Sequence, residues 1–147
     1  GLEAHAPGML RQEPLPHSSG AKLVMDAYNA NPASMRASLE AFIEEFKSRA
    51  KTLVLGDMKE LGPDSPRFHR ELGEWLAGLD LKAVYLVGPE MRAAQAALLA
   101  AKPRFPVSHA PAARDFAPAL KGKLAAQDAV LFKGSRAMRL EDLAKEI

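Results

Sequence analysis

DAYNANP, residues 26–32, follows the short apolar run Leu23–Met25 and ends at a proline that can open a helix. Four of its seven side chains can form hydrogen bonds: Asp26, Tyr28, Asn29 and Asn31. A corner between a strand and a helix needs only one or two such residues, as a turn former and an N-cap. The excess of polar groups at this corner therefore predicts a binding site at the end of a strand.

The alternation of a short apolar strand with a longer helix repeats along the chain. Further strands are expected at 52–55, 83–87, 106–108 and 129–132, and helices are expected to open at Pro32, Ser65, Pro89, after Pro111 and near Leu140. Within the helices, apolar residues recur at steps of three and four. This rhythm predicts an α/β fold: a Rossmann-like three-layer domain whose mostly parallel sheet has about five or six strands, with helices on both faces.

Residues 1–21 differ in pattern from the rest of the chain. Prolines and glycines at 7, 8, 14, 16 and 20 interrupt any regular periodicity, and only Met9–Leu15 suits a short edge strand. We therefore expect a boundary segment over residues 1–21 and one domain over residues 22–147.

Composition narrows the class of protein. A chain of 147 residues with 48% hydrophobic and 26% charged residues suits one soluble globular domain. The net charge of +2 is spread over mixed acids and bases, which is a poor match to a nucleic-acid surface. No apolar run is long enough to cross a bilayer and no signal peptide is visible, so no membrane contact is expected. The absence of cysteine excludes disulfides and thiolate chemistry and is compatible with a reducing cytoplasm.

The other expected strands also end in distinctive loops, at 56–62, 88–90 and 133–136. Ligands of open α/β sheets bind outside the carboxyl ends of the strands, so these loops and DAYNANP should share one edge. There Asp26 can accept ribose hydroxyls, and the ring of Tyr28 can stack on a purine. Lys133 and Arg136 can hold phosphate or carboxylate, and Gly134 permits close backbone approach.

Several catalytic signatures are missing. The chain has no G-x-x-x-x-G-K phosphate loop and no G-x-G-x-x-G, and its four histidines are scattered without a metal-ligand spacing. His69 is expected to be structural or exposed, and neither a metal site nor a catalytic residue is predicted. The pattern indicates half of a nucleotide site, without the phosphate loop that should accompany it.

Three motifs carry a family resemblance: DAYNANPASM at 26–35, VLGDMKELG at 54–62 and FKGSR at 132–136. Over residues 8–147 the chain resembles the C-terminal domain of the Mur ligases. It is most similar to the members that add D-alanyl-D-alanine to UDP-N-acetylmuramoyl-tripeptide. The resemblance implies a Rossmann-like domain of a three-domain, ATP-dependent ligase of cytoplasmic peptidoglycan synthesis. The N-terminal and central domains, absent from this chain, would bind the UDP end of the substrate and carry the phosphate loop and the magnesium ligands.

The resemblance also implies roles for the first polar cluster. Asp26 would lie near the ribose of ATP, and Tyr28 and Asn29 near the adenine. Asn31 would cap the following helix or touch the nucleotide, and the cap is the simpler interpretation. Arg11 is the candidate for an arginine that family members have at the hinge before this domain, and residues 1–21 would be that hinge and the end of the central domain.

The later loops receive roles by the same resemblance. Lys133, Ser135 and Arg136 would face the phosphates or the incoming dipeptide. The loop beside them would be shaped by Gly56, Asp57 and Glu60. Each of these acids and bases could instead be an ordinary loop charge, although cations at a helix start are unfavourable unless an anion binds there.

Two alternatives stay open at this point. The chain could be the C-terminal domain of another Mur or folylpolyglutamate-type ligase, since the amino substrate rests on the resemblance. It could also be a stand-alone nucleotide-binding module. As the C-terminal domain of a D-alanyl-D-alanine-adding ligase, the isolated chain is expected to be inactive, because the groups for phosphoryl transfer and magnesium binding would lie elsewhere.

Overall fold

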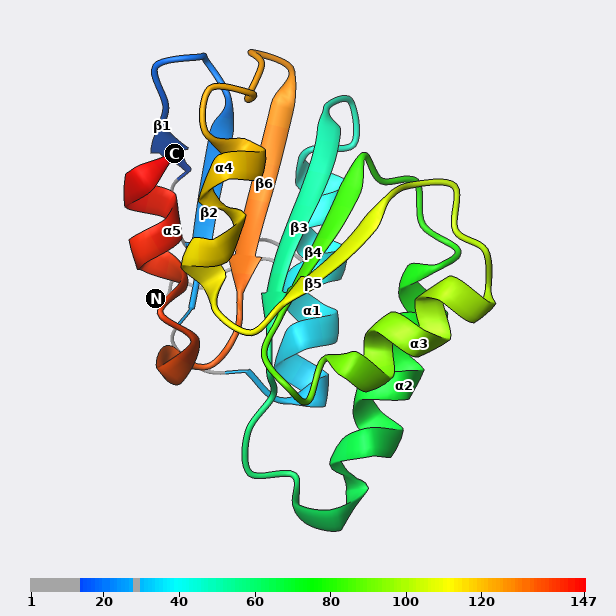
Figure 1. Ribbon diagram of the computed structural model, residues 1–147. Helices are drawn as coiled ribbons and strands as arrows, with labels where there is room; N and C mark the ends of the chain where they lie inside the picture. Colours follow the sequence, from blue (N-terminus) through cyan, green and yellow to red (C-terminus); the bar gives the residue numbers. More distant parts are fainter. Residues whose placement is uncertain (1–13, 28–29) are drawn as a thin grey trace, which may run out of the picture.

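The computed structural model describes residues 14–27 and 30–147 and shows one twisted sheet between two layers of helices (Figure 1). Six strands lie in the order β1-β2-β6-β3-β4-β5. They are β1 (Leu15–Pro16), β2 (Lys22–Asp26), β3 (Ala50–Gly56), β4 (Ala83–Val87), β5 (Val107–Ala110) and β6 (Asp128–Lys133). β1 pairs antiparallel with β2, and the other pairs are all parallel. The predicted fold class is confirmed.

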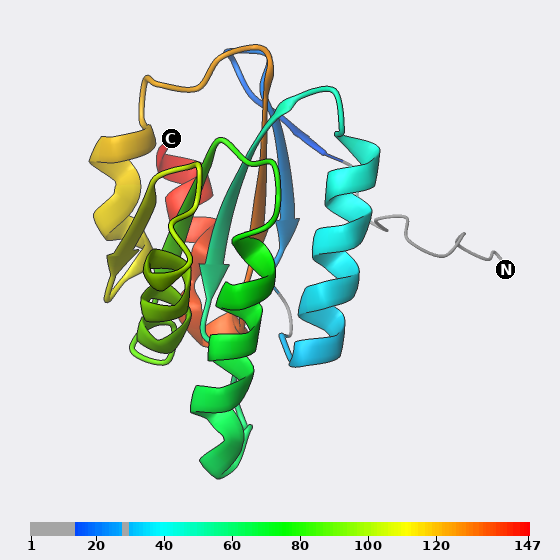
Figure 2. The same ribbon diagram turned by 90° about the vertical axis from the view of Figure 1, so that its right-hand side faces the viewer.

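The helices divide between the two faces of the sheet. One face is covered by α1 (Pro32–Glu45), α2 (Ser65–Leu76) and α3 (Arg92–Ala100), and the other by α4 (Ala117–Leu120) and α5 (Leu140–Glu146). Figure 2 shows α1 and the α4–α5 pair on opposite sides of the strands. Short 3₁₀ turns stand before α2, α4 and α5: η1 (Gly62–Asp64), η2 (Ala113–Phe116) and η3 (Arg136–Met138).

Each face has its own apolar core, because the parallel strands are buried on both sides. Under α1 and α2 the core includes Met35, Leu39, Phe42 and Leu76, and all four side chains are fully buried. Under α4 and α5 it includes Phe116, Leu120, Leu140 and Leu143. The apolar residues at helical spacing in the sequence are those that face the sheet.

The start of α1 follows from its local sequence. The Asn31 side chain accepts a hydrogen bond from the Ser34 N–H at 2.9 Å, and the Ser34 hydroxyl accepts from the Asn31 N–H at 3.0 Å. Pro32 occupies the first helical position, where its missing N–H has no cost. Asn31 therefore serves as the N-cap, as the simpler interpretation of the sequence has it.

Three element boundaries differ from the prediction. α3 begins at Arg92, because Pro89–Met91 form a turn ahead of it. The helix expected after Pro111 is two short pieces, η2 and α4, and ends at Leu120, where the following Lys121 is extended. The edge strand expected over Met9–Leu15 is observed only at Leu15–Pro16, and residues 9–13 lie outside the described part of the chain.

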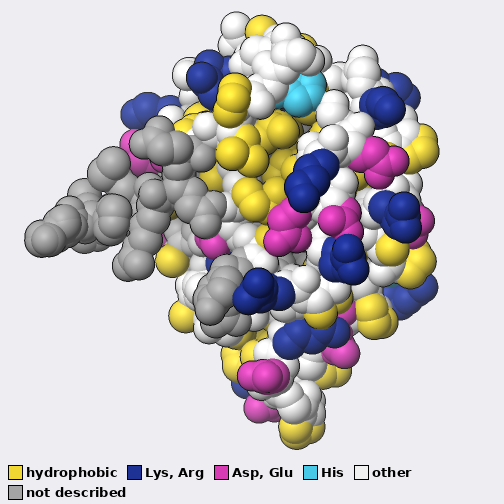
Figure 3. Space-filling model, turned by 90° about the vertical axis from the view of Figure 1, so that its left-hand side faces the viewer, with side chains coloured by type: hydrophobic (Ala, Val, Ile, Leu, Met, Phe, Trp, Pro, Cys, Tyr) yellow, Lys and Arg dark blue, Asp and Glu magenta, His cyan; other side chains and the backbone are white. Residues whose placement is uncertain are grey.

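β1 and α5 lie on one side of the molecule, where hydrophobic side chains reach the surface among charged ones (Figure 3). Leu15 on β1 is 46% exposed. The His17 ring donates from Nε2 to the carbonyl oxygen of Ile147 at 2.7 Å, which ties the β1–β2 turn to the end of α5. Within residues 14–27 and 30–147, no helix has the length and apolar character needed to cross a membrane.

Candidate functional site

From β2 the chain crosses to β3, β4 and β5 in turn, and it then returns to place β6 between β2 and β3. α1 follows β2 and α2 follows β3 on one face, whereas α5 follows β6, the strand between them, on the other face. Elements that leave neighbouring strands toward opposite faces open a crevice at the carboxyl edge of the sheet. The ends of β2, β6 and β3 meet there, with Asp26 opposite Lys133 and Leu55 opposite the same lysine. The expected gathering of these loops at one edge is confirmed.

Asp26 and Lys133 form an ion pair at this carboxyl edge, where β2 and β6 end. The Lys133 ammonium lies 3.2 Å from Oδ2 of Asp26, and the Ser38 hydroxyl of α1 donates to the same oxygen at 2.5 Å. The lysine side chain is 3% exposed and the aspartate side chain 26%. The carboxylate is thus held from two elements while one side of it reaches solvent.

The segment after β6 packs closely on the end of β3. A Cβ added to Gly134 would lie 3.0 Å from the backbone of Gly56, so the close approach expected at Gly134 is made by a neighbouring strand. Ser135 is buried, and its N–H donates to the Asp57 carbonyl oxygen at 3.4 Å. Its hydroxyl is buried without a hydrogen-bond partner among the described residues. Arg136 opens η3 and is exposed.

Asp57 lies inside the protein. It is fully buried, its Oδ1 accepts from the Met91 N–H at 3.0 Å, and its Oδ2 lies 3.5 Å from the Lys59 ammonium. A Cβ at Gly88 would lie 2.5 Å from this carboxylate. Asp57 therefore fixes the β3–α2 loop against the β4–α3 loop. Glu60 of the same loop is exposed and has a left-handed backbone, with φ of 62°.

The structure adds His69, Ser65 and Glu90, three residues to which sequence reasoning gave no role in the site. His69 of α2 is fully buried and accepts the Met58 N–H on Nε2 at 3.1 Å. Its Nδ1 lies 2.8 Å from the carbonyl oxygen of Ser65, whose hydroxyl donates to Glu90 Oε1 at 2.5 Å. The four-residue spacing of the serine and the histidine on one helix was the available signal. Of the two expectations for His69, structural or exposed, the structural one is confirmed.

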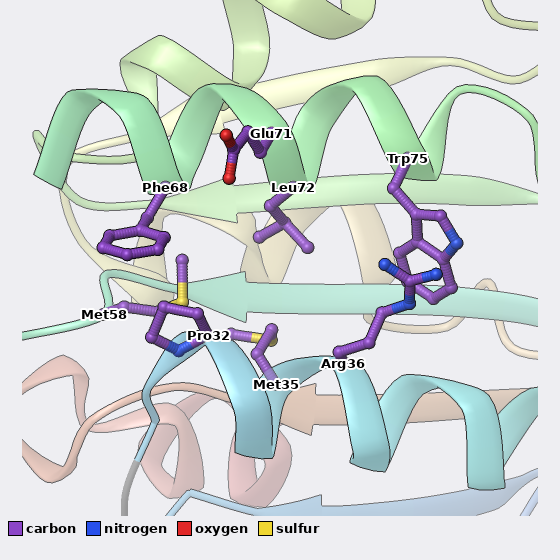
Figure 4. A pocket seen from close by; sticks show the side chains of 8 residues that line it. All are labelled: Pro32, Met35, Arg36, Met58, Phe68, Glu71, Leu72 and Trp75. Atoms are coloured by element: carbon purple, nitrogen blue, oxygen red, sulfur yellow. The ribbon is translucent and has the colours of Figure 1, made fainter. Parts of the chain in front are cut away.

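A pocket of about 110 Å³ lies between α1 and α2, next to the end of DAYNANP (Figure 4). Its walls come from the two helices and its floor includes the loop after β3; the lining residues are Pro32, Met35, Arg36, Met58, Phe68, Glu71, Leu72 and Trp75. The Arg36 guanidinium stacks 4.0 Å from the centre of the Trp75 ring. With charges only on Arg36 and Glu71, both half-exposed, the pocket suits an apolar group better than a phosphate.

Three predicted contacts lie outside the described residues: Arg11, Tyr28 and Asn29. Their roles, and the ligand roles of Asp26, Asn31, Lys133, Ser135 and Arg136, therefore stay predictions. Within the described ranges, no three acidic or histidine side chains come together in a way that could hold a metal ion.

The three motifs at 26–35, 54–62 and 132–136 all lie within the part of the chain that matches a known protein family. The model of the family described as "Mur ligase, glutamate ligase domain" matches residues 10–136. The UDP-N-acetylmuramoyl-tripeptide–D-alanyl-D-alanine ligase of Bacillus subtilis is 33% identical over 138 residues, which are 94% of this chain and 30% of that protein. The ligase of the same name from Treponema pallidum is 36% identical over 123 residues, 82% of this chain and 26% of that protein.

Solved structures of MurF ligases contain a region with the same fold as this chain. The MurF ligase of Thermotoga maritima in complex with ADP superposes with a TM-score of 0.71 at 31% identity, covering 92% of this chain and 31% of that one. MurF from Acinetobacter baumannii gives a TM-score of 0.76 at 28% identity, covering 97% of this chain and 31% of that one. The chain thus spans about 30% of the length of these relatives.

Proposed function

The chain belongs to the Mur ligase family, and from that premise we propose that it is the C-terminal domain of an ATP-dependent UDP-N-acetylmuramoyl-tripeptide–D-alanyl-D-alanine ligase. Support comes from relatives of that name that are similar over most of this chain and from the ADP complex of one of them. In this proposal residues 1–21 carry the hinge and the end of the central domain together with the edge strand β1, and residues 22–147 close over the reaction site. The complete ligase would act in the cytoplasm, in peptidoglycan synthesis.

The observation that carries the proposal is the Asp26–Lys133 pair at the carboxyl edge of the sheet. Lys133 and Ser38 hold Oδ2 of the carboxylate, which leaves Oδ1 to accept the hydroxyls of a ribose. A carboxylate that is already held in place loses little freedom when it binds a ligand. Tyr28 and Asn29 would then contact the base.

The phosphates and the dipeptide are assigned to the segment after β6. Ser135 and Arg136 lie at the end of a strand next to β2, and Arg136 is exposed. A guanidinium can bind phosphate or carboxylate through two hydrogen bonds. The buried Ser135 hydroxyl, without a hydrogen-bond partner among the described residues, is a further group that a ligand or a water could satisfy.

Magnesium would be held outside this chain, by the central domain, which would also supply the phosphate loop. The metal would neutralise the phosphates during transfer to the tripeptide carboxylate. This chain's own part is to bind and orient ATP and the dipeptide amine. It follows that the purified chain, given ATP, magnesium, UDP-N-acetylmuramoyl-tripeptide and D-alanyl-D-alanine, forms no amide product. Product above the enzyme-free background would overturn this assignment.

The nucleotide role is tested by amide NMR titration of the chain with Mg-ATP. We expect saturable shifts at Tyr28, Asn29, Ser135 and Arg136, with an affinity that is weak because half of the site is missing. The Asp26→Asn variant should lose most of these shifts.

The matched control is Asp128→Asn. Asp128 is also an acid paired with a lysine, 2.8 Å from Lys82, but it lies at the amino end of β6. It should keep the nucleotide shifts. Equal shifts in the wild type and in Asp26→Asn would refute the role of Asp26. No saturable shift at millimolar nucleotide would mean that the site forms only with the central domain.

The rival function, a stand-alone nucleotide-binding module, is separated by the coding sequence upstream. A phosphate loop in frame with this chain supports the ligase, and its absence supports the module. Among ligases, the amino substrate is decided by assaying the complete enzyme with D-alanyl-D-alanine, lysine, diaminopimelate and glutamate. Preference for any of the last three would reject the proposed substrate.

A further inference from the structure

His69 contacts one loop of the carboxyl edge directly, and further hydrogen bonds connect that loop and α2 to two others. Its Nε2 accepts the N–H of Met58, the residue after Asp57 in the β3–α2 loop. Through the Ser65 hydroxyl the same part of α2 reaches Glu90 in the β4–α3 loop. The Asp57 carbonyl in turn accepts the N–H of Ser135, in the segment after β6.

These contacts require one form of the imidazole. A backbone N–H can only donate, so Nε2 facing Met58 must carry a lone pair. The proton of the neutral ring then sits on Nδ1, which lies 2.8 Å from the Ser65 carbonyl oxygen, an acceptor. The Ser65 hydroxyl donates its own proton to Glu90 and so leaves only a lone pair for Nδ1, at 3.2 Å. Each polar atom of this fully buried ring is satisfied in that form alone.

We propose that His69 is a positioning residue, which in its neutral, Nδ1-protonated form sets the backbone of Asp57–Met58 and thereby the place of Ser135 at the proposed nucleotide and dipeptide site. The Met58 side chain also lines the pocket between α1 and α2, so the same contact sets part of the pocket floor (Figure 4). This inference rests on the proposed function for its role in ligand binding. The geometry itself is testable without any ligand.

Two other histidines of the chain supply an internal control for the ring form. His109 places Nε2 2.6 Å from the Gly88 carbonyl oxygen, and His17 places Nε2 2.7 Å from that of Ile147. Both must therefore carry their proton on Nε2. Long-range ¹H–¹⁵N spectra at neutral pH should show the Nδ1–H pattern for His69 and the Nε2–H pattern for His17 and His109. An Nε2–H pattern or a charged ring at His69 would overturn the proposal.

Variants test the positioning. The side-chain amide of glutamine can place an oxygen near the position of Nε2, so His69→Gln can keep an acceptor for Met58, whereas His69→Ala cannot. In His69→Ala, hydrogen exchange at the Met58 amide should rise about tenfold or more, and the Ser135 amide should shift and exchange faster. His69→Gln should restore a large part of both. Rescue by glutamine, which fills the space differently from imidazole, separates the hydrogen bond from packing.

The matched control is Leu76→Val, a fully buried change on the same helix, which packs in the core away from the loop. It should raise exchange across α2 without a selective change at Met58 or Ser135. Equal responses in His69→Ala and Leu76→Val, or no rescue by glutamine, would reduce His69 to a packing residue.

Nucleotide titration of the same variants completes the test. We expect weaker Mg-ATP shifts at Ser135 and Arg136 in His69→Ala and recovery in His69→Gln. Unchanged shifts in His69→Ala would refute the link to the site. If the wild type binds no nucleotide, the proposed function fails for the isolated chain, while the ring form and the exchange at Met58 and Ser135 still decide the positioning role.

Discussion

Substitution of Gly88 by alanine gives the most direct test of the contact between the two loops. Gly88 directly follows β4 and has φ of 104°, a backbone region that costs a residue with a Cβ about 1–3 kcal/mol. The new Cβ would lie 2.5 Å from the Asp57 carboxylate, which is fully buried and accepts the Met91 N–H. Moving that carboxylate away breaks a hydrogen bond to a charged acceptor, at roughly 1.5–3 kcal/mol. The expected loss of unfolding free energy is therefore about 2.5–6 kcal/mol.

Urea denaturation, followed by the fluorescence of the single tryptophan, Trp75, measures this loss. In a thermal scan the same loss lowers the Tm by roughly 5–24 °C for a domain of this size. A domain of similar fold from Haemophilus ducreyi, 14% identical and with a TM-score of 0.58, has been crystallised as a single domain, and 97% of its length is covered by this chain. The fold thus exists as a unit that such an assay can follow.

Gly122 supplies the matched control for Gly88. It also has a positive φ, 75°, but a Cβ there meets no atom within 4 Å. Gly122→Ala should cost only the backbone term, about 1–2 kcal/mol. If Gly88→Ala costs no more than Gly122→Ala, the buried carboxylate does not lie against Gly88. In an Asp57→Ala background the cost of Gly88→Ala should fall to that of the control, a coupling of about 2 kcal/mol.

Three further predictions concern stability, each read from urea denaturation. Asn31→Ala removes the cap of α1 and should cost about 1 kcal/mol, and addition of Ser34→Ala should cost little more because the two side chains form one capping box; fully additive losses would contradict the box. Lys133→Met leaves the Asp26 carboxylate without its cation and should cost roughly 1–3 kcal/mol, below the range for a fully buried pair because Asp26 is partly hydrated; with Asp26→Asn added, most of that loss should disappear. Gly73→Ala should destabilise in spite of a gain of about 1 kcal/mol in helix propensity, because its Cβ would meet the backbone of α3; a more stable variant would show that α2 and α3 can separate without cost.

The sequence alone predicted the elements whose cause is local. The strand over Ala83–Val87 and the cap at Asn31 occur where the apolar run and the Asn-Pro pair place them. The edge that carries the loops was also predictable, because parallel strands must end on the same side.

Features that depend on distant partners were not predictable. The burial of Asp57 depends on Gly88 and the Met91 N–H, and neither can be inferred from the loop itself. The pairing of Lys133 with Asp26 requires β6 to lie next to β2, and an alternation of strands and helices does not fix the order of the strands. For the same reason, the sequence does not reveal that the ring of His69 accepts a hydrogen bond from the Met58 N–H.

The place of β6 in the sheet has a consequence for how the chain folds during synthesis. Residues 22–26 pair with residues 129–133, so the strand that joins β2 to β3 is the last one to leave the ribosome. Until β6 pairs, the facing edges of β2 and β3 have no partner strand, and unpaired strand edges can pair with other chains. Long-range parallel pairing is also intrinsically slow. The domain should therefore reach its native state in a late step governed by β6, and chains truncated before residue 128 should aggregate in place of folding partially.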